Sequence, residues 1–136
     1  MSDIVRGPSP GGGRNAWVYY NGLVWTVGMP GAKKTAGMDI KAQTELALAQ
    51  IDERLAQAGT DKSRILEATV FITSMDDFKG MDAAWQAWCG DDTGVGASRA
   101  TGCVAELAGK DLVEVKCSVA AAPGCIPATS PICTNL

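Results

Sequence analysis

The chain has 136 residues and a mass of 14.1 kDa, the size of one ordinary domain. Hydrophobic residues make up 46% and charged residues 20%, which excludes a largely disordered chain, and no apolar run is long enough for a membrane span. The net charge of −3 gives no general attraction for nucleic acid or an anionic membrane, so we expect a soluble cytoplasmic protein that binds neither.

A β-hairpin is predicted after a Gly- and Pro-rich N-terminal segment. Trp17–Tyr20 and Leu23–Val27 are β-rich runs separated by Asn21-Gly22. Asn-Gly between two such runs is a strong hairpin signal, because a type I′ turn needs a positive φ at both central residues. Gly28 ends the second strand.

An amphipathic helix is predicted over residues 39–58. Asp39 suits the N-cap and Gly59 the stop. Apolar and small side chains recur at spacings of three and four residues, which places them on one face; they are Ile40, Thr44, Ala47, Leu48, Ile51 and Leu55.

A buried strand and a second helix follow. Ile65–Thr73 is β-branched and nearly continuously apolar, as a strand covered on most sides would be. The helix begins after Ser74 or Asp76, and Gly90 ends it. Aromatic residues and Met81 recur along it at helical spacing.

Two more strands, Arg99–Leu107 and Leu112–Ala121, complete the order ββαβαββ. A single mixed β-sheet with two helices packed on one face is the economical α+β arrangement for this order. We expect residues 1–122 to form one domain and residues 123–136 to form a Pro-rich C-terminal tail.

The absence of histidine excludes Ser-His-Asp catalysis, Cys-His catalysis and metal sites that use imidazole. No two cysteines form a CxxC pair, which argues against a zinc site, and we expect no metal and no cofactor. Cys103 and Cys117 fit small core or sheet residues. Cys125 and Cys133 could pair in an oxidising compartment, whereas the cytosol would keep them reduced.

Two ionisable residues stand in strand-like contexts. Arg99 opens one strand, and Glu114 lies between Val113 and Val115, on the opposite face from them. One interpretation is that Glu114 and Lys116 share a solvated sheet face. The other is that a neighbouring subunit encloses Glu114, where Arg99 on the adjacent strand would pair with it.

Several motifs between Gln43 and Ala121 resemble one known family. They include the run Ile65–Ile72, the motif Asp76-Asp77-Phe78, and Ala97-Ser98-Arg99 followed across the last two strands by Glu114. This block resembles the Rid/YjgF superfamily of imine and enamine deaminases. Residues 50–66 and the Trp85/Trp88 pair are most similar to its YoaB-like branch.

The resemblance implies a chorismate-mutase-like α+β protomer that forms a homotrimer, with a ligand cleft between each pair of subunits. The resemblance further implies that the family's arginine, matched by Arg99, binds the substrate carboxylate. The family's late-strand glutamate, matched by Glu114, would position the attacking water. A guanidinium can bind a small carboxylate through bidentate hydrogen bonds, and a nearby carboxylate can orient water and relay a proton.

The sequence departs from the family pattern around this cleft. Arg14 stands where the family has a tyrosine, and Val27 stands where it has a serine, just before Gly28. Arg14 is either an exposed loop charge or a second cation for a substrate with a second carboxylate. The substrate-binding residues implied are Arg99, Arg14, Asn15, Trp25, Val27, Gly28 and Thr101.

Three functions remain open at this point. The first is a Rid-like hydrolase, an enzyme that converts an imine, enamine or related C–N compound carrying a carboxylate to a carbonyl and ammonia. The second is a non-catalytic trimeric binder of small carboxylates or 2-ketoacids with a regulatory or scavenging role. The third, nuclease activity, is disfavoured by the acidic pI of about 4.8 and by the lack of a basic stripe.

Overall fold

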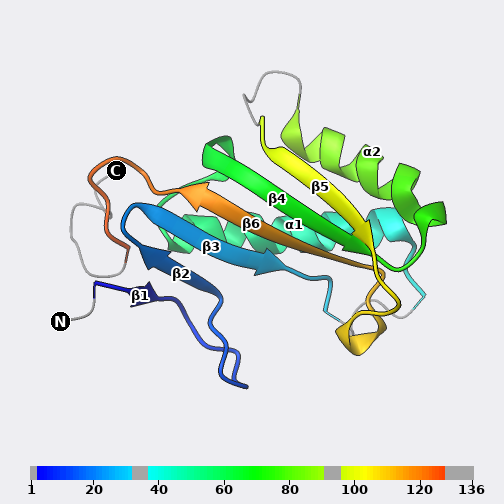
Figure 1. The fold of residues 1–136 in the computed structure, drawn as a ribbon, viewed down its shortest axis with the longest axis horizontal. Helices are drawn as coiled ribbons and strands as arrows, with labels where there is room; N and C mark the ends of the chain where they lie inside the picture. The colour runs from blue at the N-terminus through cyan, green and yellow to red at the C-terminus, as the bar shows by residue number, and fades with distance from the viewer. Residues whose placement is uncertain (1–2, 32–36, 91–95, 128–136) are drawn as a thin grey trace.

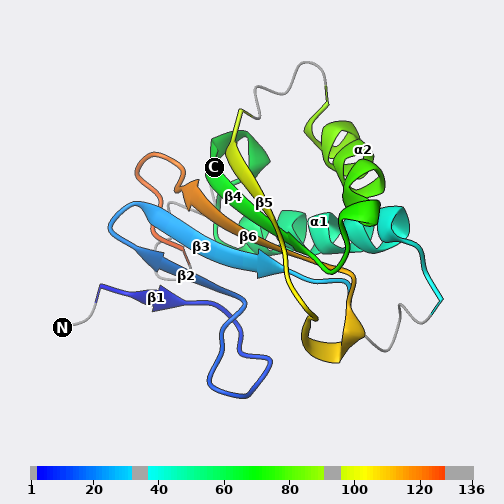
Figure 2. The same ribbon diagram turned by 45° about the vertical axis from the view of Figure 1, so that its right-hand side comes forward.

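Six strands form one mixed sheet, and two helices cover one of its faces (Figures 1 and 2). The computed structural model describes residues 3–31, 37–90 and 96–127. The spatial order of the strands is β1-β2-β3-β6-β4-β5, and only the β4–β5 pair is parallel. The strands are β1 Val5–Arg6, β2 Trp17–Tyr20, β3 Leu23–Gly28, β4 Ile65–Ile72, β5 Ser98–Cys103 and β6 Val113–Ala120.

The predicted hairpin is confirmed. β2 and β3 pair antiparallel with Tyr20 opposite Leu23. Between them Asn21 and Gly22 have φ values of 50° and 86°, the left-handed conformation that a type I′ turn requires.

Both predicted helices are confirmed as well. α1 runs over Ile40–Gln57, and the Asp39 side chain accepts a hydrogen bond from the Ala42 amide at 2.8 Å, so Asp39 is the N-cap. α2 runs over Phe78–Cys89 after a short 3₁₀ turn. Within the described residues no helix is both long and apolar enough to cross a membrane.

The hydrophobic core lies between the helices and one face of the sheet. The buried face of α1 presses against the end of β3, where there is no space for a side chain at Gly28. A Cβ there would lie 2.3 Å from the Ala47 carbonyl oxygen. The largest fully buried side chains include Leu48, Ile51, Leu55, Ile72, Met81, Val70 and Val115.

The other sheet face carries no helix, as Figure 1 shows with both helices behind the strands. Side chains alternate between the faces, so the residues opposite the core point to this uncovered side. Trp25, Val27 and Phe71 lie there, each only half-buried. We call this surface the open face.

Two local predictions differ from the structure. The N-terminal segment contains an additional strand, β1, which pairs with β2, and the Gly7 amide next to it donates to the Trp17 carbonyl. β5 ends at Cys103 instead of Leu107. The two cysteines agree with the prediction of core or sheet residues, since Cys117 is buried and Cys103 lies exposed in β5 at the sheet edge.

The first residues of the predicted C-terminal tail pack on the rest of the protein. Cys125 and Pro127 are both buried, and Cys125 is disulfide-bonded. Cys133 and the rest of residues 128–136 lie outside the described part of the chain.

Candidate functional site

Arg99 lies on β5, the edge strand, and its side chain turns toward α2. It is directly opposite Ala68 of β4, which is buried beneath the helices, so both side chains share the helix-covered face. The guanidinium Nη2 is 2.8 Å from Oδ1 of Asp82. Its central carbon lies 5.4 Å from the Trp85 ring centroid and 6.0 Å from that of Phe78.

Asp82 fixes this arrangement from α2. Its second oxygen accepts a hydrogen bond from Gln86 Nε2 at 2.8 Å, one helical turn away. The hydrogen bond from Arg99 lowers the pKa of Asp82 below its ordinary value. The ion pair with Asp82 anchors one edge of the Arg99 guanidinium. Because the side chain is 18% exposed, its other N–H groups can still reach a ligand. Thr101, opposite buried Val70, follows on the same face.

Glu114 lies on β6 and points to the open face. It pairs with Phe71 of β4, whereas its neighbours Val113 and Val115 are fully buried on the helix side. Lys116 is two residues further on the same face, opposite Val27 of β3. Trp25 lies on this face as well, and the structure thus groups Glu114 with two of the predicted binding residues.

The expected pairing of Arg99 with Glu114 on adjacent strands is wrong within one chain. β4 lies between β5 and β6. In addition, the register places Arg99 on the helix-covered face and Glu114 on the open face. A cleft that uses both side chains therefore needs more than one copy of the chain.

Arg14 and Asn15 lie at the opposite side of the molecule from Arg99. They belong to the connection between β1 and β2, at one edge of the sheet, whereas β5 forms the other edge (Figure 1). The exposed Arg14 donates from Nε to the Gly11 carbonyl at 3.3 Å, and Asn15 Nδ2 donates to the Gly7 carbonyl at 2.8 Å. A pocket holding both Arg14 and Arg99 does not form within one chain.

Gly28 is buried against α1, so its missing side chain serves helix packing on the core side. Its neighbour Val27 faces the other way and also offers its carbonyl to Arg54 of α1. The two adjacent residues thus contribute to different faces of the sheet.

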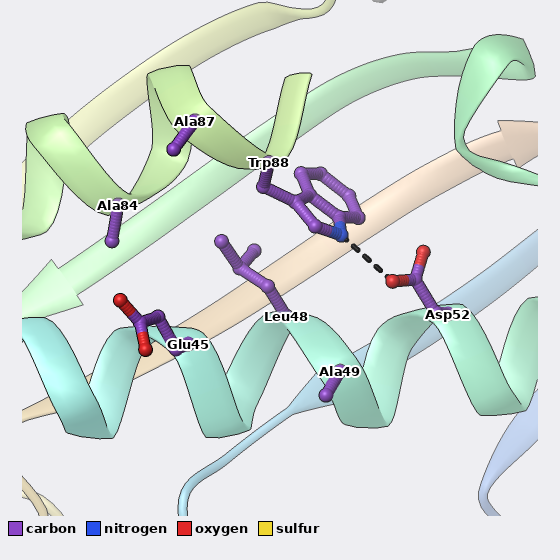
Figure 3. A pocket seen from close by; sticks show the side chains of 7 residues that line it. All are labelled: Glu45, Leu48, Ala49, Asp52, Ala84, Ala87 and Trp88. Atoms are coloured by element: carbon purple, nitrogen blue, oxygen red, sulfur yellow. Dashed lines mark hydrogen bonds between the residues drawn. The ribbon is translucent and has the colours of Figure 1, made fainter. Parts of the chain in front are cut away.

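A groove runs between the two helices on the outer surface (Figure 3). It encloses about 280 Å³, and small residues form much of its wall. Trp88 projects from α2 across it and donates its indole N–H to Asp52 of α1 at 2.9 Å. Lys62 lies over the same indole, 5.1 Å from its centroid. Trp88 therefore joins the helices and is only partly a packing residue, whereas Trp85 is buried as expected.

Asp82 is the site residue that the sequence reasoning missed. Its position carries a usable signal, because residues 78, 82 and 85 fall on one helix face at spacings of four and three. A carboxylate between two aromatic residues on an otherwise apolar face favours a nearby cation, and Arg99 pairs with it in the structure.

Comparison with known proteins agrees with this fold. The sequence model of the family described as Endoribonuclease L-PSP matches residues 8–121. The RutC family protein YoaB from Escherichia coli is 39% identical over 71 residues, which is 52% of this chain. The chain spans only about 60% of the length of the curated relatives it matches.

Solved structures extend the likeness to nearly the whole chain. NMB1025 from Neisseria meningitidis, described as a member of the YjgF protein family, is 30% identical and superposes with a TM-score of 0.77 over 90% of this chain and 98% of its own. YyfA from Yersinia pestis, described as a protein of unknown function of the Rid family, is 27% identical with a TM-score of 0.74, covering 88% and 95%. The chain therefore belongs to the Rid/YjgF family, the family described as Endoribonuclease L-PSP.

Proposed function

We propose that the chain is a Rid-type hydrolase that converts an imine or enamine carrying a carboxylate to a carbonyl compound and ammonia. Membership of the family is the observation that carries this proposal, because the family match spans residues 8–121 and includes both Arg99 and Glu114. Both side chains are partly accessible, as groups that meet a substrate must be.

The two residues divide the chemistry between them. Arg99 binds the substrate carboxylate through N–H groups that Asp82 leaves free, which fixes the imine carbon in one orientation. Glu114 accepts a proton from water as the water oxygen attacks that carbon and passes this proton to the nitrogen, so the C=N double bond becomes a C–N single bond with an amino group. Glu114 then transfers the proton of the new hydroxyl group to the amino nitrogen, and collapse of the tetrahedral intermediate re-forms C=O and expels ammonia.

The cleft forms between protomers of a homotrimer in this proposal. Arg99 at the β5 edge of one copy then meets Glu114 on the open face of the next, since the two cannot meet within one chain. Half-buried Trp25 and Phe71 support this arrangement, because apolar side chains on an uncovered sheet face favour burial against another surface. A symmetric trimer contains three such clefts.

The test is an assay in which an amino acid oxidase generates 2-iminoacids in situ and the rate of carbonyl appearance is followed. We expect wild-type protein to accelerate the hydrolysis, and Arg99→Ala and Glu114→Gln to abolish the acceleration. Lys116→Gln is the matched control, because Lys116 shares the open face with Glu114 and has no role in the mechanism. No acceleration by the wild type would overturn the proposal.

The second candidate is a non-catalytic binder of small carboxylates. It is favoured by Arg14 and Val27, which stand in place of the two hydroxyl-bearing residues of the family pattern. Saturable binding of a 2-ketoacid that depends on Arg99, together with no acceleration in the same assay, would establish this function in place of the enzyme.

A further inference from the structure

A second hollow lies where α1 meets the segment before β2, away from Arg99. It encloses about 240 Å³. Gln50, Arg54 and Gln57 of α1 form one wall at spacings of four and three residues, and Pro8 and Pro10 contribute to the other.

The two glutamines have their orientation fixed by hydrogen bonds. Gln57 Oε1 accepts the indole N–H of Trp17 at 3.1 Å, and Gln50 Oε1 accepts the Met29 amide at 2.9 Å. Both donors can bond only to the carbonyl end of a side-chain amide. Among the described residues the NH₂ group of neither glutamine has a hydrogen-bond partner, so each can donate to a ligand in the hollow.

Arg54 adds a half-buried cation without a counter-ion. Its Nη1 donates to the Val27 carbonyl, and within the described residues no carboxylate lies within the 4.0 Å of an ion pair. Burial lowers the pKa of Arg54, and the charge of Arg14 lowers it further, although Glu53 acts in the opposite direction. A half-buried guanidinium without an ion-pair partner is stabilised by an anion that enters the hollow.

We propose that this hollow binds a small oxyanion, a carboxylate or a phosphate group, through the Arg54 guanidinium and the free amide N–H groups of Gln50 and Gln57. The positive charge of Arg14 draws the anion in. Glu53 on the rim opposes it, and therefore limits the affinity. This site does not depend on the proposed hydrolase activity, and none of the residues in it belongs to the Arg99–Glu114 mechanism.

The experiment titrates the ¹⁵N-labelled full chain at constant ionic strength, with inorganic phosphate in one series and acetate in the other. The indole N–H of Trp17 reports on the site because it is bonded to Gln57. We expect a saturable shift of this resonance, and the anion with the higher affinity identifies the class. The same titration of Arg99→Ala should give unchanged affinity, which separates this site from the proposed active site.

Two variants at the hollow change the affinity in opposite directions. Gln57→Glu keeps an oxygen to accept the Trp17 indole but replaces the free donor with negative charge, so it should weaken binding about tenfold. Glu53→Gln removes the opposing charge and should tighten it about threefold. Glu45→Gln, on the other groove of α1, is the control and should change nothing.

Gln50→Glu repeats the donor test with the Met29 contact retained, should Gln57→Glu lower the stability of the fold. The absence of a saturable Trp17 shift with either ion would overturn the proposal. So would equal affinities for the wild type and for a folded Gln57→Glu or Gln50→Glu variant.

Discussion

Arg99 and Glu114 lie on opposite faces of the sheet, and this separation makes a specific prediction about mixed oligomers. If each cleft takes Arg99 from one protomer and Glu114 from the next, two inactive variants can restore each other. In the proposed mechanism, Arg99→Ala lacks the carboxylate anchor and Glu114→Gln lacks the base. A cleft that combines the intact arginine of the second variant with the intact glutamate of the first contains both groups.

The recovered activity follows from the symmetry of a closed trimer. When equal amounts of the two variants assemble at random, about three-quarters of the trimers contain both kinds of chain. In each of these, whichever variant is in excess, one of the three clefts is intact. The mixed trimers should therefore show about a third of the wild-type activity, and the whole refolded mixture about a quarter. If both residues of a cleft came from the same chain, every cleft would lack one group and no activity would return.

The assay mixes the two variants in denaturant, refolds them together and follows 2-iminoacid hydrolysis. Each variant refolded alone is the baseline, and different affinity tags on the two variants show that mixed assemblies have formed. Activity that stays at the baseline in tagged, mixed trimers would refute the shared cleft. A monomeric particle in sedimentation would refute it as well.

Two further predictions concern the framework that positions the site. Gly28→Ala should lower the free energy of unfolding by about 3 kcal/mol and the melting temperature by about 10 °C, because the new Cβ would lie 2.3 Å from the Ala47 carbonyl oxygen. Gly102→Ala is the control, since its new Cβ would have no such neighbour within 4 Å, and it should change the free energy of unfolding by less than about 1 kcal/mol. Equal losses in the two variants would contradict the steric reasoning. The pKa of Asp82 is lowered in the folded state, so the pair with Arg99 stabilises the fold above the unfolded pKa and loses this effect as the pH falls through the folded one. The stability difference between wild type and Asp82→Asn in denaturant titrations should therefore shrink below about pH 4, and a difference independent of pH would show that the charge pair does not contribute.

Local elements could be predicted from the sequence because their signals are local. The Asn21-Gly22 turn, the Asp39 cap and the spacing of apolar residues on α1 each depend on neighbours in the chain, and each is found in the structure. β1 was missed because two residues carry no periodicity. Its pairing depends on Gly7 packing against Trp17, ten residues away.

The relative positions of Arg99 and Glu114 could not be predicted from local signals. The expectation that their strands are adjacent assumed that strands consecutive in the sequence are neighbours in the sheet. β4, α2 and β5 form a βαβ unit, whose crossover places β5 parallel and next to β4. β6 then pairs with the free side of β4, antiparallel to it. β4 therefore lies between β5 and β6, and the register places Arg99 and Glu114 on opposite faces.

The side chains of Arg99 and Glu114 differ in how the chain holds them. Asp82, held by Gln86 of α2, orients Arg99 within a single chain, so the carboxylate anchor of the proposed mechanism would be preorganised before oligomer formation. Glu114 has no comparable partner among the described contacts of the open face, and a free carboxylate there can still take up a water molecule. In the proposed mechanism, assembly of the trimer brings the anchored Arg99 of one copy to Glu114 of the next, so catalysis would depend on oligomer formation.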